Sequence, residues 1–255
     1  MDGIAGTSIA ISGGAGDIGS AMGAELTKHG GRVTLLDRKT PAEARPWIER
    51  ASGHGPVDYV QADVTDRPSI DAALAAIDSL DVAIVNQAIG RGIGFLDLTQ
   101  EQWQEHVDVN LTGCFNVAQA AARLMAARGI GGRVIFTGTW VMDIPWPEIS
   151  AYSATKAGVK MLARSMAREL AVHKILVNVI APGIVYAGLA KHQMETEPQY
   201  LRRIQHVIPL GRPQQAEEVA QATAFLCSSA ASYMTGSVLL ADGGCSLFQF
   251  DEGDS

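Results

Sequence analysis

The stretch Ser8–Gly23 constrains the possible folds of this chain more than any other. An apolar segment, Ser8–Ser12, leads directly into a glycine-rich turn, after which small residues suited to a helix follow. Gly14, Gly16 and Gly19 have the G-x-G-x-x-G spacing that lets backbone N–H groups approach a pyrophosphate at the start of a helix. No Gly-Lys-Ser or Gly-Lys-Thr follows, which argues against the other common phosphate-binding turn. The pattern predicts a nucleotide-binding turn, although a turn with a purely steric role has the same spacing.

A carboxylate follows the next apolar segment, Arg32–Asp37. Asp37 lies 18 residues after Gly19 (37 − 19), close to the spacing of about 20 at which an acidic residue binds the adenosine ribose. It can accept both ribose hydroxyls of NAD, but it would repel the 2′-phosphate of NADP, and the glycine turn contains no Lys or Arg. NAD is therefore the expected cofactor. Arg38 and Lys39 weaken the case for NAD over NADP, because a neighbouring cation would partly neutralise Asp37.

Apolar segments alternate with segments of helical periodicity along the whole chain. Most of the apolar segments are continuous runs of Val, Ile, Leu and Ala, which is typical of strands buried on both faces. The predicted strands are Ser8–Ser12, Arg32–Asp37, Val57–Ala62, Asp81–Asn86, Arg133–Thr137, Ile175–Ala181 and Gly236–Ala241. The predicted helices are Asp17–His29, Ser69–Leu80, Gln100–Arg128, Ser150–Val172 and Gln215–Ser228.

This alternation predicts an α/β fold: a doubly wound parallel sheet (Rossmann fold) of about seven strands, with helices on both faces. No linker divides the chain, so residues 1–255 are expected to form a single domain. Thr99 and Gln102 form a capping box at the start of the third predicted helix. Pro41 and Pro46 leave room for only a short, irregular helix between the second and third strands.

Charge and composition narrow the range of partners. The net charge is −7, no run of Lys or Arg occurs, and residues 251–255 form an acidic tail, so nucleic acid is not an expected partner. The N-terminus has no basic segment and no apolar run approaches about 18 residues, which favours a soluble, cytoplasmic protein. Cys114, Cys227 and Cys245 are expected to be buried thiols. The histidines are scattered, so no metal site is expected.

Polar residues follow the predicted strands at the edge where such sheets bind ligands. Each of them alone has an alternative role as a turn former or a helix cap. They are Asp37, Asp63, Asn86, Thr139 and Pro182-Gly183.

Tyr152 and Lys156 are four residues apart at the start of a predicted helix, so both side chains leave the same face. A free phenol has a pKa near 10, and a nearby ammonium lowers the pKa because it favours the phenolate. Tyr152 is therefore a candidate general acid and base for a hydroxyl or carbonyl substrate. Alternatively, Tyr152 and Lys156 are an ordinary pair of side chains on a helix surface with no catalytic role.

Taken together, these motifs resemble the short-chain dehydrogenase/reductase family, from Ser8 to Gly244. Members have Thr-Gly-x-x-x-Gly-x-Gly at the first turn, Asn-Asn-Ala-Gly after the fourth strand, and Tyr-x-x-x-Lys with a serine thirteen residues before the tyrosine. With a further asparagine, the tetrad here is Asn110, Thr139, Tyr152 and Lys156. The resemblance implies that Tyr152 exchanges a proton with the substrate, while Lys156 binds the nicotinamide ribose and lowers the pKa of the tyrosine. It also implies that Thr139 binds the substrate oxygen and that Asn110 holds a proton-relaying water.

The chain departs from the family pattern at several positions. Asp17 stands where members usually have a glycine, and it is expected to point outward or to cap the first helix. Asn86-Gln87-Ala88-Ile89 replaces Asn-Asn-Ala-Gly, and Ala187 replaces a threonine. The expected cofactor contacts are Ser12, Gly13, Gly16, Asp17, Ile18, Gly19, Asp37, Arg38, Asp63, Val64, Asn86, Ala88, Tyr152, Lys156, Pro182, Gly183 and Val185.

A long connection, residues 185–209, is expected to be a lid with helix-like stretches at Leu189–Met194 and Pro198–Val207. Aromatic faces and a carboxylate near Tyr152 favour a ring with several hydroxyls, although the aromatic residues could instead fill the core or a subunit interface. The expected substrate contacts are Thr139, Trp140, Trp146, Glu148, Tyr152 and Tyr186.

The predicted function is an NAD(H)-dependent oxidoreductase that interconverts a secondary alcohol, preferably a sugar or polyol, with its ketone or lactone. The alternatives are a reductase of cyclic or hydrophobic ketones, an isomerase or dehydratase on the same fold, and a non-catalytic NAD-binding regulatory or scaffold protein. The resemblance implies a homotetramer built on the helices Gln100–Arg128 and Ser150–Val172 and on the final strand.

Overall fold

Seven parallel strands form one sheet in the structure, a computed structural model that describes residues 1–129, 131–197, 200, 204 and 206–247. The strand order is β3-β2-β1-β4-β5-β6-β7, so the order reverses between β1 and β4. Ser12 at the end of β1 lies opposite Leu36 of β2 and Val85 of β4. The strands are β1 (Ser8–Ser12), β2 (Arg32–Asp37), β3 (Val57–Gln61), β4 (Val82–Val85), β5 (Gly132–Thr137), β6 (Ile175–Pro182) and β7 (Val238–Ala241).

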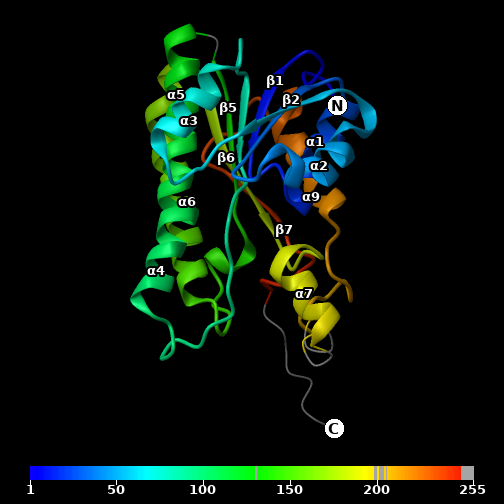
Figure 1. The fold of residues 1–255 in the computed structure, drawn as a ribbon, viewed down its shortest axis with the longest axis vertical. Coiled ribbons are helices and arrows are strands. Elements are labelled where there is room, and N and C mark those ends of the chain that lie inside the picture. The colour runs from blue at the N-terminus through cyan, green and yellow to red at the C-terminus, as the bar shows by residue number, and fades with distance from the viewer. Residues whose placement is uncertain (130, 198–199, 201–203, 205, 248–255) are drawn as a thin grey trace.

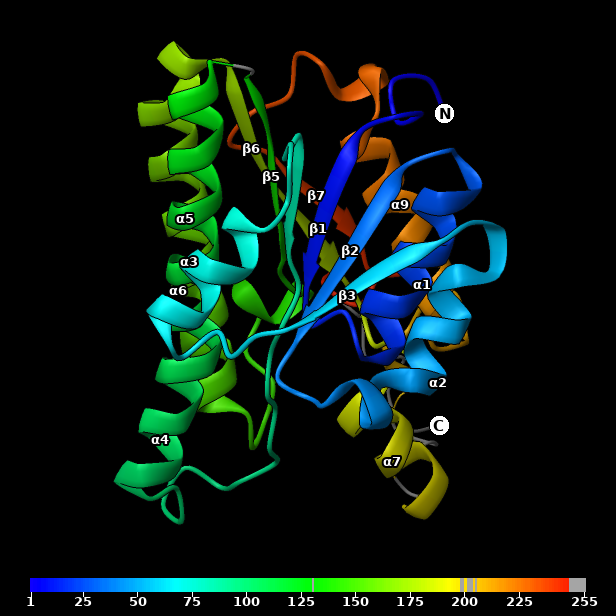
Figure 2. The same cartoon turned by 45° about the horizontal axis from the view of Figure 1, so that its top comes forward.

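Helices cover both faces of this sheet, as Figures 1 and 2 show from two directions. One face carries α1 (Asp17–Lys28), α2 (Pro41–Ala51) and α9 (Ala216–Cys227). The opposite face carries α3 (Arg67–Ala75), α4 (Gln100–His106), α5 (Gly113–Arg128) and α6 (Ser150–Leu170). The helix α7 (Gly188–Thr196) lies below the sheet in Figure 1. The predicted doubly wound α/β fold is confirmed.

The central strands are apolar at nearly every position because both faces of the sheet are covered. In β1, Ile9 and Ile11 pack into the cluster under α1 and α9, while Ala10 faces the cluster under α3, α5 and α6. In β5, Ile135 faces the first cluster and Phe136 the second. Successive side chains of a strand point to opposite faces, so two buried faces require a continuous apolar run.

Close backbone packing explains two glycines of the first turn. A Cβ atom on Gly14 would lie 2.7 Å from Leu35 Cβ, and one on Gly19 would lie 2.3 Å from the Gly13 carbonyl oxygen. Any side chain at either position would therefore push α1 away from the sheet.

The expectation of a short, irregular helix between β2 and β3 is wrong. The helix α2 runs over Pro41–Ala51 with Pro41 in its first turn, where a missing N–H costs nothing. A capping box at Thr40 and Glu43 starts the helix, and the same hydrogen bonds to Thr40 lower the pKa of Glu43. Pro46 inside the helix removes one backbone hydrogen bond, but capping and the burial of Ala44 hold the helix together.

The predicted helix Gln100–Arg128 is interrupted. The capping box at Thr99 and Gln102 is confirmed, but a π-helical turn at Val107–Thr112 separates α4 from α5. Such turns insert one extra residue into the helical ladder and are frequent at functional sites. Periodicity alone does not reveal the turn, because α4, the turn and α5 follow one another without a non-helical residue between them.

The predicted lid is described in part. The stretch Leu189–Met194 falls within α7, whereas most of Pro198–Val207 and the acidic tail 251–255 lie outside the described residues. Among the described residues, no helix has the length and apolar character needed to cross a bilayer.

Candidate active site

A cavity of about 880 Å³ opens at the carboxyl ends of the strands, across the point where the strand order reverses. Of the expected cofactor contacts, those that line it are Gly13, Gly16, Asp17, Ile18, Gly19, Asp37, Arg38, Asp63, Val64, Asn86, Ala88, Tyr152, Lys156, Pro182, Gly183 and Val185. Ser12 is not among the described lining residues: its hydroxyl lies against the Gln87 amide oxygen and the Ile84 carbonyl. Within the described chain, no group of three His, Cys, Asp or Glu side chains is placed to hold a metal ion.

The glycine turn fits the pyrophosphate of a dinucleotide. Gly13 has φ +64°, a conformation that favours glycine, and Gly16 precedes the first turn of α1. A Cβ atom on Gly16 would meet nothing closer than the Gly13 carbonyl oxygen at 3.6 Å, so this side of the turn faces the cavity. The free N–H groups of a helix N-terminus together with a bare glycine backbone form the usual cradle for phosphate.

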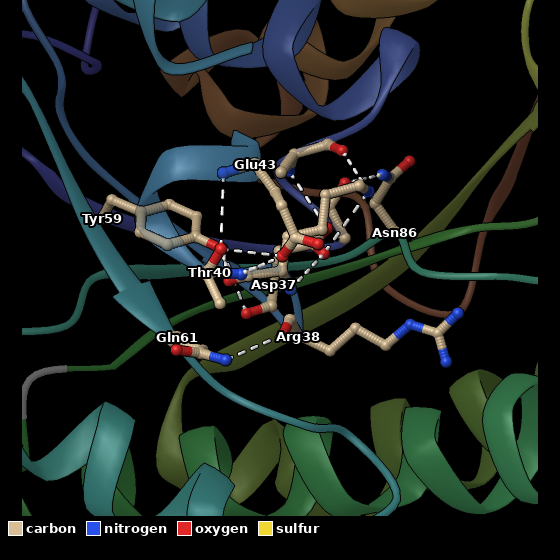
Figure 3. A network of polar contacts seen from close by, with 10 residues as sticks. Asp37, Arg38, Thr40, Glu43, Tyr59, Gln61 and Asn86 are labelled. Atoms are coloured by element: carbon tan, nitrogen blue, oxygen red, sulfur yellow. Dashed lines mark hydrogen bonds and ion pairs between the residues drawn. The ribbon is translucent and has the colours of Figure 1, made fainter. Parts of the chain in front are cut away.

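Asp37 has a fixed position at the end of β2 (Figure 3). Its carboxylate accepts the N–H of Ala15 at 3.1 Å and the N–H of Lys39 at 3.2 Å. These two bonds orient the carboxylate at the rim of the cavity, where it can accept ribose hydroxyls.

Asp17 does not cap α1, and its carboxylate lies in an exposed contact at the cavity. Among the described residues, α1 receives no side-chain cap hydrogen bond, and the Asp17 carboxylate instead accepts the N–H of Gly188 at 3.1 Å. Gly188 is the first residue of α7, so Asp17 connects the glycine turn to the predicted lid. The sequence could not indicate this contact, because the two residues are far apart in the chain.

Tyr152 and Lys156 project from the first turns of α6 into the cavity, which Thr139 also lines. Lys156 is 1% exposed, and its ammonium donates to the Thr137 carbonyl at 2.7 Å. The Lys156 nitrogen lies 5.8 Å from the centre of the Tyr152 ring. The helical spacing of four residues thus places the phenol and the ammonium at the same site.

The expected lowering of the Tyr152 pKa is wrong for the protein without ligands. Burial raises the pKa of Tyr152 to about 12, and the hydrogen bond from Thr139 offsets only part of that rise. Burial also lowers the pKa of Lys156, since it disfavours the charged ammonium. Burial is therefore the dominant effect on both groups, and Lys156 donates to a carbonyl and lies beside the ring of Tyr152.

Asn110 lies in the π-helical turn and is fully buried. Its side chain accepts the N–H of Ile89 at 2.8 Å and donates to the Ile89 carbonyl at 2.9 Å and to Thr155 Oγ1 at 3.3 Å. Thr155 in turn donates to the Tyr152 carbonyl at 2.7 Å. Asn110 therefore joins the loop after β4 to the helix that carries Tyr152. Its expected role in holding a water stays a prediction.

Three of the expected substrate contacts, Trp140, Trp146 and Glu148, line the cavity. The two indole rings meet edge to face, with centres 5.4 Å apart and planes at 69°. Glu148 adopts φ +67°, which is rare for a residue with a side chain, and its carbonyl accepts the N–H of Ile93 at 2.6 Å.

Tyr186, expected at the same wall, is not among the described lining residues. The Tyr186 side chain is exposed, and its hydroxyl donates to the Glu195 carboxylate at 2.7 Å.

Several functional candidates escape sequence reasoning. Trp47 of α2 lines the cavity, and the capping box at Thr40 would have indicated the helix that positions it. Gln87 donates to the buried Cys114 sulfur at 3.4 Å, beneath the glycine turn. By contrast, Gln193 of α7 is expected from the sequence as a hydrogen-bond partner in the predicted lid, and it lines the cavity opposite Gly92.

Comparison with known proteins agrees with this geometry. The family described as enoyl-(acyl carrier protein) reductase matches residues 13–246, nearly the whole chain. The chain is a short-chain dehydrogenase/reductase. A 3beta-hydroxysteroid dehydrogenase 1 from Eggerthella lenta is 33% identical to it over 262 residues, covering 99% of this chain and 99% of the relative. A D-erythrulose reductase from Gallus gallus is 30% identical, covering 92% of this chain and 93% of the relative.

Solved structures of other short-chain dehydrogenase/reductases superpose closely on this chain. Levodione reductase has a TM-score of 0.90 at 26% identity, covering 96% of this chain and 99% of its own. Further neighbours include an NADP-bound putative 2-deoxy-d-gluconate 3-dehydrogenase from Agrobacterium tumefaciens, with a TM-score of 0.86 at 28% identity, covering 94% and 96% of the two chains. A 3-ketoacyl-(acyl-carrier-protein) reductase from Brucella melitensis complexed with NADH has a TM-score of 0.86 at 26% identity, covering 96% and 100%. Family membership thus establishes an oxidoreductase with a nicotinamide cofactor. Because neighbours are found with NADP and with NADH, it does not distinguish between these two cofactors.

Proposed function

We propose that this protein is an NAD(H)-dependent oxidoreductase that interconverts a secondary alcohol and its ketone or lactone. The observation that carries the proposal is the position of Tyr152, which lies with Thr139 in the cavity that also contains the glycine turn and Asp37. A phenol at this place can exchange a proton with a substrate oxygen. When bound, a nicotinamide supplies the hydride chemistry.

The residues of the tetrad have separate tasks in this proposal. Tyr152 takes the hydroxyl proton during oxidation and returns it during reduction, while Thr139 holds the substrate oxygen beside the phenol. Lys156 would contact the nicotinamide ribose, and its ammonium, anchored on the Thr137 carbonyl, supplies positive charge next to the phenol. Asn110 positions the start of α6 through Thr155, and we assign it a bound water as well.

NAD is the proposed cofactor because Asp37 presents an oriented carboxylate to the adenosine ribose. A 2′-phosphate at that position would meet a like charge. Comparable catalytic efficiency with NADP would contradict this assignment.

For the substrate, a sugar or polyol remains the first candidate. The aromatic pair Trp140 and Trp146 offers apolar faces to ring C–H groups, and Glu148 and Gln193 offer partners to hydroxyls. A cyclic or hydrophobic ketone is the second candidate. It is supported by the apolar cluster around Trp140 and Ile184 and by the names of the hydroxysteroid and levodione relatives.

The test is a panel of sugars, polyols and cyclic or aromatic secondary alcohols, followed as NADH absorbance. Net, stoichiometric NADH production from one alcohol separates a dehydrogenase from an isomerase, a dehydratase or a non-catalytic NAD-binding scaffold. On the best sugar found, Glu148→Gln and Trp146→Ala should each raise KM. If both leave KM and kcat unchanged, this assignment of the pocket is wrong.

The proposal extends to organisation and location. Residues 1–255 would form one domain, with a lid within 185–209 and an acidic tail. Exposed apolar side chains on α4, α5, α6 and β7 support a homotetramer; they are Trp103, Phe115, Met161 and Leu240. The cysteines of the described chain are free and buried, which suits the reducing cytoplasm.

A further inference from the structure

The loop that follows Asp37, residues 38–40, is held by side chains of the neighbouring strand β3. The Tyr59 hydroxyl donates to the Lys39 carbonyl and lies 3.3 Å from the Asp37 carbonyl oxygen. The Gln61 amide donates to the Arg38 carbonyl at 3.0 Å (Figure 3). Burial raises the pKa of Tyr59 to about 12, so this hydroxyl keeps its donor proton at neutral pH. The loop therefore has a defined conformation before any nucleotide binds.

Within this loop, Lys39 reaches back over the cavity. Its ammonium donates to the Ala15 carbonyl at 2.8 Å and lies 3.6 Å from Asp37 Oδ1. It also lies over the Trp47 ring, 4.8 Å from the ring centre. A carbonyl, a carboxylate and an indole face thus surround one cation, which fixes a flexible side chain at the rim of the nucleotide site.

Arg38 is placed differently. It lines the same cavity, but no ion pair joins it to Asp37 in the part of the chain that the structure describes. In Figure 3 its side chain extends away from the loop. Of the two cations that follow Asp37, the structure places Lys39 in contact with the carboxylate.

This arrangement changes the charge that a nucleotide meets. The Asp37 side chain is 11% exposed and the Lys39 side chain 37% exposed, so water screens their interaction only in part. A group that approaches the Asp37 carboxylate also approaches the Lys39 ammonium. A ribose hydroxyl needs the carboxylate as acceptor, whereas a 2′-phosphate is repelled by Asp37 and attracted by Lys39.

We propose that Lys39, and not Arg38, determines how strongly this site discriminates against NADP. Its ammonium offsets the Asp37 charge and gives a 2′-phosphate a cationic partner, so NADP binds with lower but measurable affinity beside the preferred NAD. This inference rests on the proposed NAD-dependent function.

The test measures dissociation constants for NADH and NADPH by fluorescence titration, which needs no substrate. Lys39→Met retains an unbranched side chain that can pack on Trp47 but removes the charge. It should weaken NADPH binding by about tenfold or more, and it should change NADH binding by less than about threefold. Lys39→Arg keeps the charge and the contact with the indole and should retain NADPH binding.

Two further variants serve as controls. Lys28 lies in the last turn of α1, where it pairs with Glu25 at 3.5 Å, and it is not among the described lining residues, so Lys28→Met should leave both constants unchanged. Arg38→Met should weaken NADPH binding less than Lys39→Met does. An equal or larger loss from Arg38→Met would overturn the assignment.

The outcome also separates this inference from the proposed function. If Lys39→Met weakens both cofactors equally, Lys39 merely braces the loop and the inference fails, while the proposed function stands. The inference also fails if Lys39→Met leaves both dissociation constants, and hence their ratio, unchanged. If the unaltered protein binds neither NADH nor NADPH, the proposed function itself fails, and this inference fails with it.

Discussion

At the scale of single residues, Tyr152 is the group that we propose as the acid and base of the reaction. It is partly buried in the cavity, beside Thr139 and the ammonium of Lys156. Tyr152→Phe removes only the hydroxyl, so kcat should fall by about 10²–10⁴, the range typical of lost acid–base catalysis. NADH binding, measured by fluorescence, should persist. A variant that keeps most of its activity would exclude Tyr152 as the acid–base group.

The pH dependence follows from the direction of the Tyr152 pKa. Reduction needs the protonated phenol, and oxidation needs the phenolate. With the pKa raised to about 12, the phenol stays protonated near neutrality. We therefore expect kcat/KM for alcohol oxidation to rise with pH between about 6 and 9, while ketone reduction stays nearly flat. A flat oxidation profile would contradict this assignment of the base.

Thr139 tunes this behaviour, because its hydrogen bond lowers the Tyr152 pKa. Thr139→Ala should shift the oxidation profile to higher pH and reduce kcat/KM severely. Thr139→Ser keeps the hydroxyl and should be mild. Equal losses from both variants would point to another hydroxyl, such as that of Thr137, which also lines the cavity.

At the scale of elements, the site depends on contacts between segments that are distant in sequence. The glycine turn meets the start of α7 through Asp17 and Gly188, and the π-helical turn meets α6 through Asn110 and Thr155. Each of these hydrogen bonds holds one element against another. The strands therefore set the overall arrangement, and the hydrogen bonds position the residues of the site.

The contact between Asp17 and Gly188 leads to a prediction about the lid. Asp17→Gly, which introduces the usual family residue, removes an acceptor at the first turn of α7. Such capping contacts contribute about 0.5–2 kcal/mol, so KM for the alcohol should rise about two- to thirtyfold. NADH affinity should be unchanged or improved, since a carboxylate near the pyrophosphate is lost. A loss confined to NADH binding would show that Asp17 does not act through the lid.

At the scale of the whole molecule, apolar residues remain exposed on the face formed by α4, α5 and α6 and on the edge strand β7. We expect these surfaces to be buried in a homotetramer. Light scattering should then report a mass of about 108 kDa, four times the chain mass of 26.9 kDa. Phe115→Arg combined with Met161→Arg should yield a smaller species, because charges on this face cannot be buried without partners. A monomer at micromolar concentration would contradict the assembly.

The amino-acid sequence by itself determined the sheet, the glycine turn and the spacing of Tyr152 and Lys156. These features are local: a strand buried on both faces must be apolar throughout, and residues four apart share a helix face. The apolar runs therefore predicted all seven strands within a few residues. The helix α2 was also predictable, since its capping box is a local pattern. The two prolines led instead to the expectation of a short, irregular helix.

Tertiary structure decided what depends on packing between distant segments. The contact of Asp17 with Gly188, the ion pair of Lys39 with Asp37 and the exposed position of Tyr186 all require the folded chain. The direction of the Tyr152 pKa does too, because desolvation depends on everything that surrounds the phenol, whereas the sequence shows only its neighbour on the helix. Local patterns specify which groups exist and on which element they lie, but the free energy of a charge or hydrogen bond is set by its complete surroundings.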